Sequence, residues 1–494
     1  MFPELAFLVV ACAALMAINS WPSTLVLCTL IGILQDPMRK LAPGQPVYFV
    51  VLVGVVFGAG WLGAFGAKVP LRPRTIYQWQ GNIGAPFALF VSLVIAQALH
   101  SFALFGSSTM TAIGLLSYFA AAPAIVLAYQ WAVRCGITGI SRWMWTYVVM
   151  ASISLVGVYL EYIGVDWQTL GQVGEGLIIY DVSRALKAYA GFFRAAEIAA
   201  WHTATIASCA VILLFGKRRS LPGLVGASGL VLMLVAIGTL TGRRKLLVQV
   251  AMFVCVYFGL FALFQRHARK LAGVIGAAGL VCYLLIIGMV DADPGERMYA
   301  SHRLVVAPDD VFEAYALRAR SVIEDVGERV LGFGIQPVAW AYDQWGFFGA
   351  GVGAGSQGTQ HFGGWELVNG GAAEGGLGKV MLELGVPGLV VVVWLGVAMV
   401  RYIGRTLDYI TVTSPAHARL GYGLAALLAS NVAAFSVATQ AYGDVFILLY
   451  LGCSTGFLFA LPVLANRASH AMRAAAVQQQ RSRTGTLNGA PCST

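Results

Sequence analysis

The sequence Gly349-Ala-Gly-Val-Gly-Ala-Gly-Ser-Gln-Gly358 lies inside the one long polar stretch of this chain, Asp291 to Gly385. The region from Gly346 to Gly378 holds 13 glycines in 33 residues. Glycine adopts positive-φ conformations without steric cost, so such a backbone turns sharply and approaches a ligand without Cβ atoms intervening. We expect this segment to line a functional site and to interrupt a chain that is otherwise mostly apolar helix.

The composition excludes a soluble globular protein. Hydrophobic residues make up 59% of the 494 residues and charged residues 11%, whereas soluble domains have about half apolar and a quarter charged residues. Apolar runs of about 20 residues recur along the chain, and each is long enough to cross ~30 Å of hydrocarbon. The sequence predicts an all-α polytopic membrane protein whose surroundings are a lipid bilayer.

The distribution of charge predicts which segments face the cytoplasm. The net charge is +10, and basic residues concentrate in short connections such as Lys217-Arg-Arg219. By contrast, 12 of the 22 acidic residues lie between Asp291 and Glu374. This asymmetry fits the positive-inside rule rather than binding of nucleic acid. The long loop is therefore expected outside the cytoplasm, and no nucleic-acid partner is expected.

Beyond residue 40, the apolar runs predict spans at roughly 47–66, 84–105, 109–132, 144–163, 196–215, 222–241, 246–264, 271–290, 377–400, 419–438 and 444–463. Residues 4–34 contain two apolar pieces of about 15 residues, broken at Asn19-Ser-Trp-Pro22. One kinked span and a tight hairpin fit these pieces equally. We adopt a single crossing, because it gives about 12 transmembrane helices with both termini in the cytoplasm; the alternative is 13.

These spans divide the chain into four parts. Residues 1–290 form N-terminal transmembrane helices, 291–376 the extracytoplasmic catalytic loop, 377–465 C-terminal transmembrane helices, and 466–494 a cytoplasmic tail. The tail is rich in Ser, Gln and Arg and is expected to be disordered. Within the loop, apolar residues recur at three- or four-residue spacing from Pro308 to Leu331 and predict an amphipathic helix.

Three cations occur in the turn Thr241-Gly-Arg-Arg-Lys245, on the predicted outer side. They break the positive-inside pattern, so they call for an anionic partner such as a diphosphate headgroup. Arginine binds phosphate bidentately and keeps its charge; the alternative is a snorkelling cluster at the membrane interface. Adjacent helical residues point about 100° apart, so we expect only one of Arg243 and Arg244 to face a site.

Two further arginines are candidates. Arg194 enters a predicted span in the sequence Gly191-Phe-Phe-Arg194, and an ion pair with Glu197, three residues later, is its simplest interpretation. Arg329 lies on the polar side of the predicted amphipathic helix, nearest the glycines, and is spaced to pair with Asp325. For Arg329 a paired surface role is the alternative to ligand binding.

Two residues are candidates for a general base that deprotonates a sugar hydroxyl. Glu374 stands at the entry to a span, where a carboxylate is also the usual partner of a helix dipole. His361 follows the glycine run and titrates near neutral pH, although it could equally be an ordinary loop histidine. Glu383 lies deeper in the span and is expected to pair with Lys379, one turn earlier.

Several motifs carry no chemistry here. No zinc-ligand spacing occurs, and no cysteine lies between Asp291 and Gly385, so we expect no metal and no cofactor. The sequence from Gly353 to Gly358 fits a dinucleotide pattern but follows no predicted strand. Asp291-Ala-Asp293 resembles a nucleotide-sugar metal pair, yet it is placed on the nucleotide-free side.

The order of these motifs resembles the O-antigen ligase and O-antigen polymerase superfamily. The resemblance is carried by Gly349–Gly355, Glu374, Glu383-Leu-Gly385-Val-Pro-Gly388 and Gly191-Phe-Phe-Arg194, and covers roughly residues 170–400. It implies a metal-independent glycosyltransferase of the bacterial inner membrane. Such an enzyme takes glycan from an undecaprenyl-diphosphate-linked donor and transfers it to a glycan acceptor outside the cytoplasm.

The resemblance also implies roles for single residues. Arg243 or Arg244, together with Arg329 and Arg194, would bind the diphosphate. Nine residues before Glu383, where the family usually has histidine, this chain has Glu374.

The base therefore stays open between Glu374 and His361. The reaction also stays open between polymerisation of repeat units, in exopolysaccharide or O-antigen biosynthesis, and ligation to a lipid A core or protein acceptor. Polysaccharide export machinery is a further expected partner. A transporter or a non-catalytic assembly partner is the alternative of another class, disfavoured because no matching pair of broken spans occurs.

Overall fold

The computed structural model describes residues 2–72, 83–171, 173, 178–181, 184–215, 221–243, 245–265, 305–306, 335–355 and 375–487. Several predicted features lie outside these residues: the span at 271–290, the amphipathic helix from Pro308 to Leu331, and the site candidates Arg244, Arg329, His361 and Glu374.

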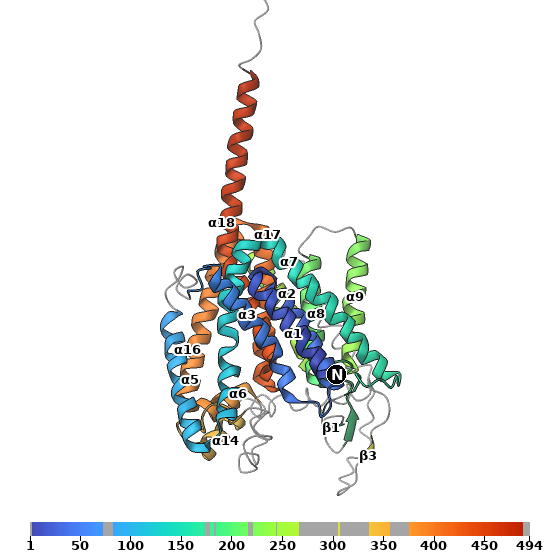
Figure 1. Cartoon of the computed structure of the whole chain (residues 1–494). Helices are drawn as coiled ribbons and strands as arrows, with labels where there is room; N and C mark the ends of the chain where they lie inside the picture. The colour runs from blue at the N-terminus through green and yellow to red at the C-terminus, as the bar shows by residue number, and fades with distance from the viewer. Residues whose placement is uncertain are drawn as a thin grey trace, which may run out of the picture.

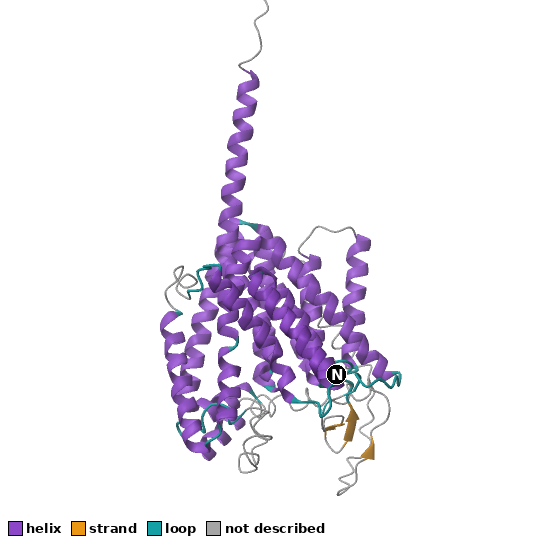
Figure 2. Cartoon of the chain, viewed as in Figure 1, coloured by secondary structure: helices purple, strands orange, loops and turns teal. Residues whose placement is uncertain are grey.

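The described chain is mostly helical (Figure 2). Its α-helices are α1 (Phe2–Asn19), α2 (Thr24–Leu41), α3 (Leu52–Gly66), α5 (Gly84–Phe105), α6 (Ser108–Phe119), α7 (Ala121–Tyr162), α8 (Ala196–Phe215), α9 (Leu221–Thr239), α10 (Lys245–Phe264), α14 (Gln336–Trp345), α16 (Gly376–Thr413), α17 (Pro415–Val437) and α18 (Val445–Leu487). Short 3-10 helices are η1 (Trp21–Ser23), η2 (Val47–Val51) and η5 (Gln440–Gly443), and the strands are β1 (Ile178–Asp181), β2 (Arg184–Lys187) and β3 (Val305–Val306).

Eight helical stretches among the described residues are long and apolar enough to cross a membrane. The longest, Ser108–Tyr162, has 55 residues and is interrupted at Gly136, whose φ of 69° and ψ of −173° leave the helical region. A 55-residue helix would be far longer than a bilayer is thick, so the kink divides it into two crossings. The protein is therefore a multi-pass membrane protein, as the composition predicted.

The bundle has two distinct ends (Figure 1). At one end α18 extends well beyond the other helices, and at the opposite end lie α14 and the strands. We call these the tail face and the loop face. The turn that contains Arg243 belongs to the loop face, because Arg243 pairs with Glu197 in the first turn of α8, just after β2. The described parts of the segments predicted to be extracytoplasmic thus gather at one end of the bundle.

Residues 2–41 form a helical hairpin, so the single kinked crossing was the wrong choice of the two. Phe7 near the start of α1 stacks 5.8 Å from Tyr48 in η2, and the end of α2 also contacts η2. The turn between the helices lies at the other end, where the Trp131 indole donates to the Pro22 carbonyl at 2.7 Å. α1 ends at Asn19, and the chain reverses through η1, which contains Pro22. α1 therefore begins on the loop face (Figure 1).

The C-terminal tail differs from the prediction of disorder, because α18 continues without a break to Leu487. Two physical reasons explain the difference. The tail is rich in alanine from Ala468 to Ala476, which has the highest helix propensity. It also extends a helix that already exists, so no costly nucleation is needed. Arg467 anchors the start of this extension by donating to the Val133 carbonyl at 2.7 Å.

Three short strands accompany the helices of the described chain. β1 pairs antiparallel with β2, and β2 pairs parallel with β3. The pairing of Arg184 with Val305 joins two loop-face segments that are far apart in the sequence. Strands of two to four residues are too short for a periodic pattern, although Ile178-Ile179 and Val305-Val306 have the β-branched side chains that strands favour.

The core of the bundle is the seam between α7 and α18. Its centre is aromatic: the Trp143 and Tyr147 rings lie 4.8 Å and 4.5 Å from the Tyr450 ring. Gly452 and Gly456 on α18 face the backbone of α7 where a Cβ would not fit. Small residues of this kind let two membrane helices approach closely, and this seam holds the start of α18 in place at the loop face.

Candidate functional site

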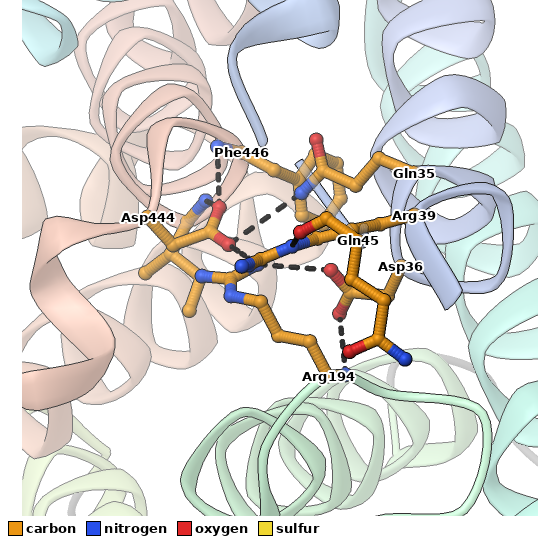
Figure 3. Close-up of polar contacts among 8 residues, drawn as sticks. Gln35, Asp36, Arg39, Gln45, Arg194, Asp444 and Phe446 are labelled. Atoms are coloured by element: carbon orange, nitrogen blue, oxygen red, sulfur yellow. Dashed lines mark hydrogen bonds and ion pairs between the residues drawn. The ribbon is translucent and has the colours of Figure 1, made fainter. Parts of the chain in front are cut away.

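Arg194 lies between two carboxylates on the loop face (Figure 3). Its guanidinium Nη1 is 3.0 Å from Asp36 Oδ1 and 2.5 Å from Asp444 Oδ2. The side chains come from α2, from the turn before α8 and from the residue before α18. All three are largely buried, with exposed side-chain fractions of 14% for Arg194, 3% for Asp36 and 2% for Asp444. This triad joins three elements at one point.

Both carboxylates of the triad have further hydrogen bonds. Asp444 Oδ1 accepts from the amides of Phe446 at 2.7 Å and Ile447 at 3.2 Å, and so caps the N-terminus of α18. Asp36 Oδ2 accepts from the Arg194 amide at 3.1 Å. Burial alone would lower the pKa of Arg194, but Asp444 and Asp36 raise this pKa well above its ordinary value. Arg194 is thus a permanent cation committed to two internal anions.

The predicted ion pair between Arg194 and Glu197 is wrong. Glu197 instead accepts from Arg243 Nη2 at 2.7 Å, while Arg194 pairs with Asp36 and Asp444. The reason is local: α8 begins only at Ala196, so Arg194 lies in a turn where helical spacing does not bring residues three apart together. The two arginines therefore have different partners and different surroundings.

The cationic turn from Thr241 to Lys245 is docked on the loop face. Gly242 makes the turn with a φ of 67°. On one side Arg243, 17% exposed, pairs with Glu197 of α8. On the other side the Lys245 ammonium donates to the Gln440 side-chain oxygen of η5. The turn is therefore fixed at both ends, which gives Arg243 and Lys245 defined positions.

Asn431 forms hydrogen bonds with residues of three elements that surround this turn. Its side-chain oxygen accepts from Trp201 Nε1 at 2.7 Å, and its carbonyl accepts from the Tyr442 hydroxyl at 2.8 Å. Gln249, one turn after Lys245 on α10, lies 3.4 Å from the same side-chain oxygen. Tyr442 belongs to η5, which also holds Gln440. Asn431, which belongs to α17, thus links α8, α10 and η5 near the contact between Lys245 and Gln440.

The entry of α16 reaches the same corner. Gly376, the first residue of α16, packs against the Phe435 ring of α17 so closely that a Cβ would not fit. The Phe435 ring lies edge-on to Tyr442 of η5, with ring centroids 5.3 Å apart. The entry of α16, which Glu374 precedes by two residues in the sequence, and the cationic turn therefore share η5 as a common support.

The predicted motif at Gly191 is explained by packing. Gly191 has a φ of 59° and lies against the backbone of Gly157 and Val158, where a Cβ would clash. Glu161 Oε2 accepts from the Gly191 amide at 2.6 Å, and Lys40 Nζ donates to the Gly191 carbonyl at 2.6 Å. The motif therefore positions the turn that presents Arg194 to its carboxylates.

The described part of the glycine run confirms the predicted positive-φ backbone. Gly346, Gly349, Gly351 and Gly353 have φ values between 67° and 96°. Within the described residues, this backbone packs closely on the bundle itself: a Cβ on Gly351 would lie 2.7 Å from Ser101 of α5. The close approach observed in this part of the chain is toward neighbouring helices, and the predicted approach to a ligand stays a prediction.

Glu383 has a partner that helical spacing did not predict. Its Oε1 accepts from the Gly355 amide at 2.9 Å, and the residue is fully buried. The ammonium of Lys379, predicted to pair with Glu383, lies 6.0 Å over the Tyr118 ring of α6. Glu383 therefore connects α16 to the end of the glycine segment.

Among the described residues, no group of three or more His, Cys, Asp or Glu side chains is arranged to hold a metal ion. The cations instead meet carboxylates, amides and rings. What this corner offers chemically is a set of fixed positive charges beside the entry of α16. In comparisons with known proteins, no family model matches the chain, and no curated protein matches it.

Sequence reasoning missed Asp36, Asp444 and Asn431. Asp36 lies 158 positions before Arg194, and no local spacing connects them. One signal was present: Asp36 and Asp444 each stand at the end of an apolar run, where an ionisable residue is costly unless it has a partner. That signal identifies residues that need partners but does not say which partners they have.

Proposed function

We propose that this chain is a glycosyltransferase of the bacterial inner membrane that polymerises undecaprenyl-diphosphate-linked oligosaccharide repeat units, in exopolysaccharide or O-antigen biosynthesis. One observation carries the proposal. The turn with Arg243 and Lys245 contacts η5 through Gln440, and the entry of α16 packs on Phe435, which in turn contacts Tyr442 of η5, on the loop face of a multi-pass bundle. A fixed cationic corner beside a membrane is the electrostatic setting that a diphosphate leaving group needs.

The proposed reaction is a single displacement at the anomeric carbon. An acceptor hydroxyl attacks this carbon, its proton passes to Glu374 or His361, and the bond to the diphosphate oxygen breaks. Undecaprenyl diphosphate leaves with the bonding electron pair, and Arg243 or Arg244 stabilises its charge. Because one displacement occurs, the configuration at the anomeric carbon is inverted.

The contacts of Arg194 change its part in the proposal. A guanidinium held by two buried carboxylates has little remaining positive field for a phosphate. We assign to Arg194 the structural role of holding α2, α8 and α18 together. Binding of the diphosphate is assigned to the turn at Arg243 and to Arg329. Arg243 also pairs with a carboxylate, that of Glu197.

The test is turnover by the purified protein in detergent or proteoliposomes. Supplied with lipid-linked repeat units alone, a polymerase forms a ladder of longer lipid-linked glycans. A ligase forms product only when lipid A core or a protein acceptor is added. Translocation of the lipid-linked glycan without any new glycosidic bond would replace the enzyme proposal with a transporter, and no change to the glycan at all would leave a non-catalytic assembly partner.

A further inference from the structure

The glycine segment Gly346–Gly355 inserts between helices instead of covering them. The side-chain amide of Gln97, on α5, donates to the Phe348 carbonyl at 2.8 Å. The backbone carbonyl of Gln97 accepts from the Val352 amide at 3.3 Å. On the α6 side, Gly353 packs on the backbone at Met110. Non-helical backbone inside a membrane bundle is tolerated only where protein groups satisfy it. This segment therefore depends on specific partners.

A break in α16 supplies two of those partners. Gly385 has a φ of 67° and interrupts the helix. In an unbroken helix the Val386 amide would donate to the Leu382 carbonyl, four residues earlier. Instead the Val386 amide donates to the Phe347 carbonyl at 2.9 Å, and the Leu382 carbonyl accepts from the Ala350 amide at 2.7 Å. The segment replaces one helical hydrogen bond with two of its own.

Glu383 supplies the third partner, at the far end of the segment. It lies within the broken region of α16, is fully buried, and accepts from the Gly355 amide at 2.9 Å. A Cβ on Gly355 would lie 3.3 Å from Glu383 Oε1 and 3.2 Å from Lys379 Cγ. A buried carboxylate is costly unless hydrogen bonds satisfy it, so its presence here calls for a specific role.

We infer that Glu383 is a positioning residue that locks the end of the glycine segment into the bundle through the Gly355 amide. The two bonds at Phe347 and Ala350 hold the start of the segment, and Glu383 holds its end. The described chain resumes at Gly375, which immediately precedes α16. Glu383 thus ties residue 355 to the same helix that begins at residue 376.

The consequence for catalysis rests on the proposed function. Both candidate bases, His361 and Glu374, lie in the sequence between Gly355 and Gly375. Residues 355 and 375, which flank both candidates in the sequence, are thus both placed relative to α16. Glu383 would then affect the rate of transfer without contacting the substrate.

Thiol labelling tests the lock independently of activity. Ala354 is 7% exposed, so a cysteine introduced by Ala354→Cys should react slowly with a charged maleimide in the full-length protein. Adding Glu383→Leu removes the acceptor while keeping the size, and we expect labelling to become roughly ten- to a hundred-fold faster because a charged hydrogen bond is lost. Adding Glu383→Gln keeps an oxygen acceptor, and labelling should stay slow.

The native thiol of Cys209, fully buried in α8, is the internal control. It should stay unreactive in all variants, and each thiol is followed separately by mass spectrometry. Equal labelling at residue 354 in wild-type and Glu383→Leu backgrounds would overturn the inference, as would fast labelling in the Glu383→Gln background. If Cys209 reacts in the Glu383→Leu variant, that variant has a folding defect and its labelling is not interpreted. The inference is then tested by Glu383→Gln alone, which should fold, label slowly at residue 354 and transfer glycan at the wild-type rate.

The same variants separate this inference from the proposed function. If the lock and the function both hold, Glu383→Leu loses turnover mainly through kcat and Glu383→Gln retains it. If the labelling pattern appears but the wild-type protein transfers no glycan, Glu383 still positions the segment and the proposed function fails.

Discussion

The Arg194 guanidinium and the Asp444 carboxylate lie 2.5 Å apart at the loop face, although the two residues are far apart in the sequence. With Asp36 they form a buried triad that joins α2, α8 and α18 (Figure 3). In a bundle built mainly from apolar surfaces, such a contact specifies which helix ends meet. The triad therefore fixes the frame on which the cationic turn and η5 rest.

The first prediction concerns this triad. Arg194→Ala leaves two buried carboxylates without their cation, and we expect about 3–5 kcal/mol of destabilisation. Thermal unfolding of the purified protein in detergent measures the effect. Arg401→Ala, which changes an exposed arginine near the tail face, is the matched control and should have almost no effect. Equal melting temperatures for the Arg194 and Arg401 variants would contradict a structural role for the triad.

The second prediction concerns the cationic turn. In Arg243→Lys and Arg244→Lys the charge is kept but the bidentate fork is lost. At the position that binds diphosphate, we expect a loss of roughly ten- to a hundred-fold in turnover, because a charged hydrogen bond contributes about 1.5–3 kcal/mol. Arg405→Lys, an exposed position on α16, is the control. Near-normal turnover in both turn variants would contradict diphosphate binding and would leave these arginines a role in membrane topology only.

The third prediction separates the two candidate bases. If Glu374 is the base, Glu374→Gln should lower kcat by roughly a hundred-fold or more with little change in donor affinity, and His361→Ala should be much milder. The reverse order would assign proton abstraction to His361. Two active variants would mean that neither residue is needed. Membrane insertion of each variant must equal that of the wild type, because glycines follow Glu374 directly.

The fourth prediction concerns Lys40. This residue is 3% exposed, and its ammonium donates to the Gly191 carbonyl at 2.6 Å. Lys40→Met removes the donor while keeping an apolar side chain of similar length, so we expect about 1–3 kcal/mol of destabilisation. Thermal unfolding of the purified protein in detergent measures the effect. A melting temperature equal to that of the wild type would contradict this role of Lys40.

The fifth prediction concerns topology. Because α1 and α2 form a hairpin, the start of α1 should share a compartment with the long loop. Cysteines placed by Glu4→Cys and Thr359→Cys should both react with an impermeant thiol reagent in cells whose outer membrane alone is permeable. Labelling of Thr359→Cys only after the inner membrane is broken would contradict an extracytoplasmic loop. Protection of Glu4→Cys alone would contradict the hairpin.

The sequence was sufficient for features that depend on local composition. Apolar runs of the right length predicted α5 and α8 with the observed ends, and glycine content predicted the positive-φ backbone from Gly346 to Gly353. Features that depend on contacts between segments far apart in the sequence were not predictable. The hairpin at Pro22 and the pairing of Arg194 required knowing which helix ends share a face, and local spacing favoured Glu197 instead.

The most direct test of the proposed glycosyltransferase is the stoichiometry of its reaction in purified form. Lipid-linked repeat units are supplied to the protein, and undecaprenyl diphosphate released is measured together with glycosidic bonds formed. The single displacement predicts one undecaprenyl diphosphate for each new bond, with an inverted anomeric configuration, and strong suppression of both in the base variant. Bond formation with retained configuration, or no release of undecaprenyl diphosphate by active, folded protein, would contradict the account.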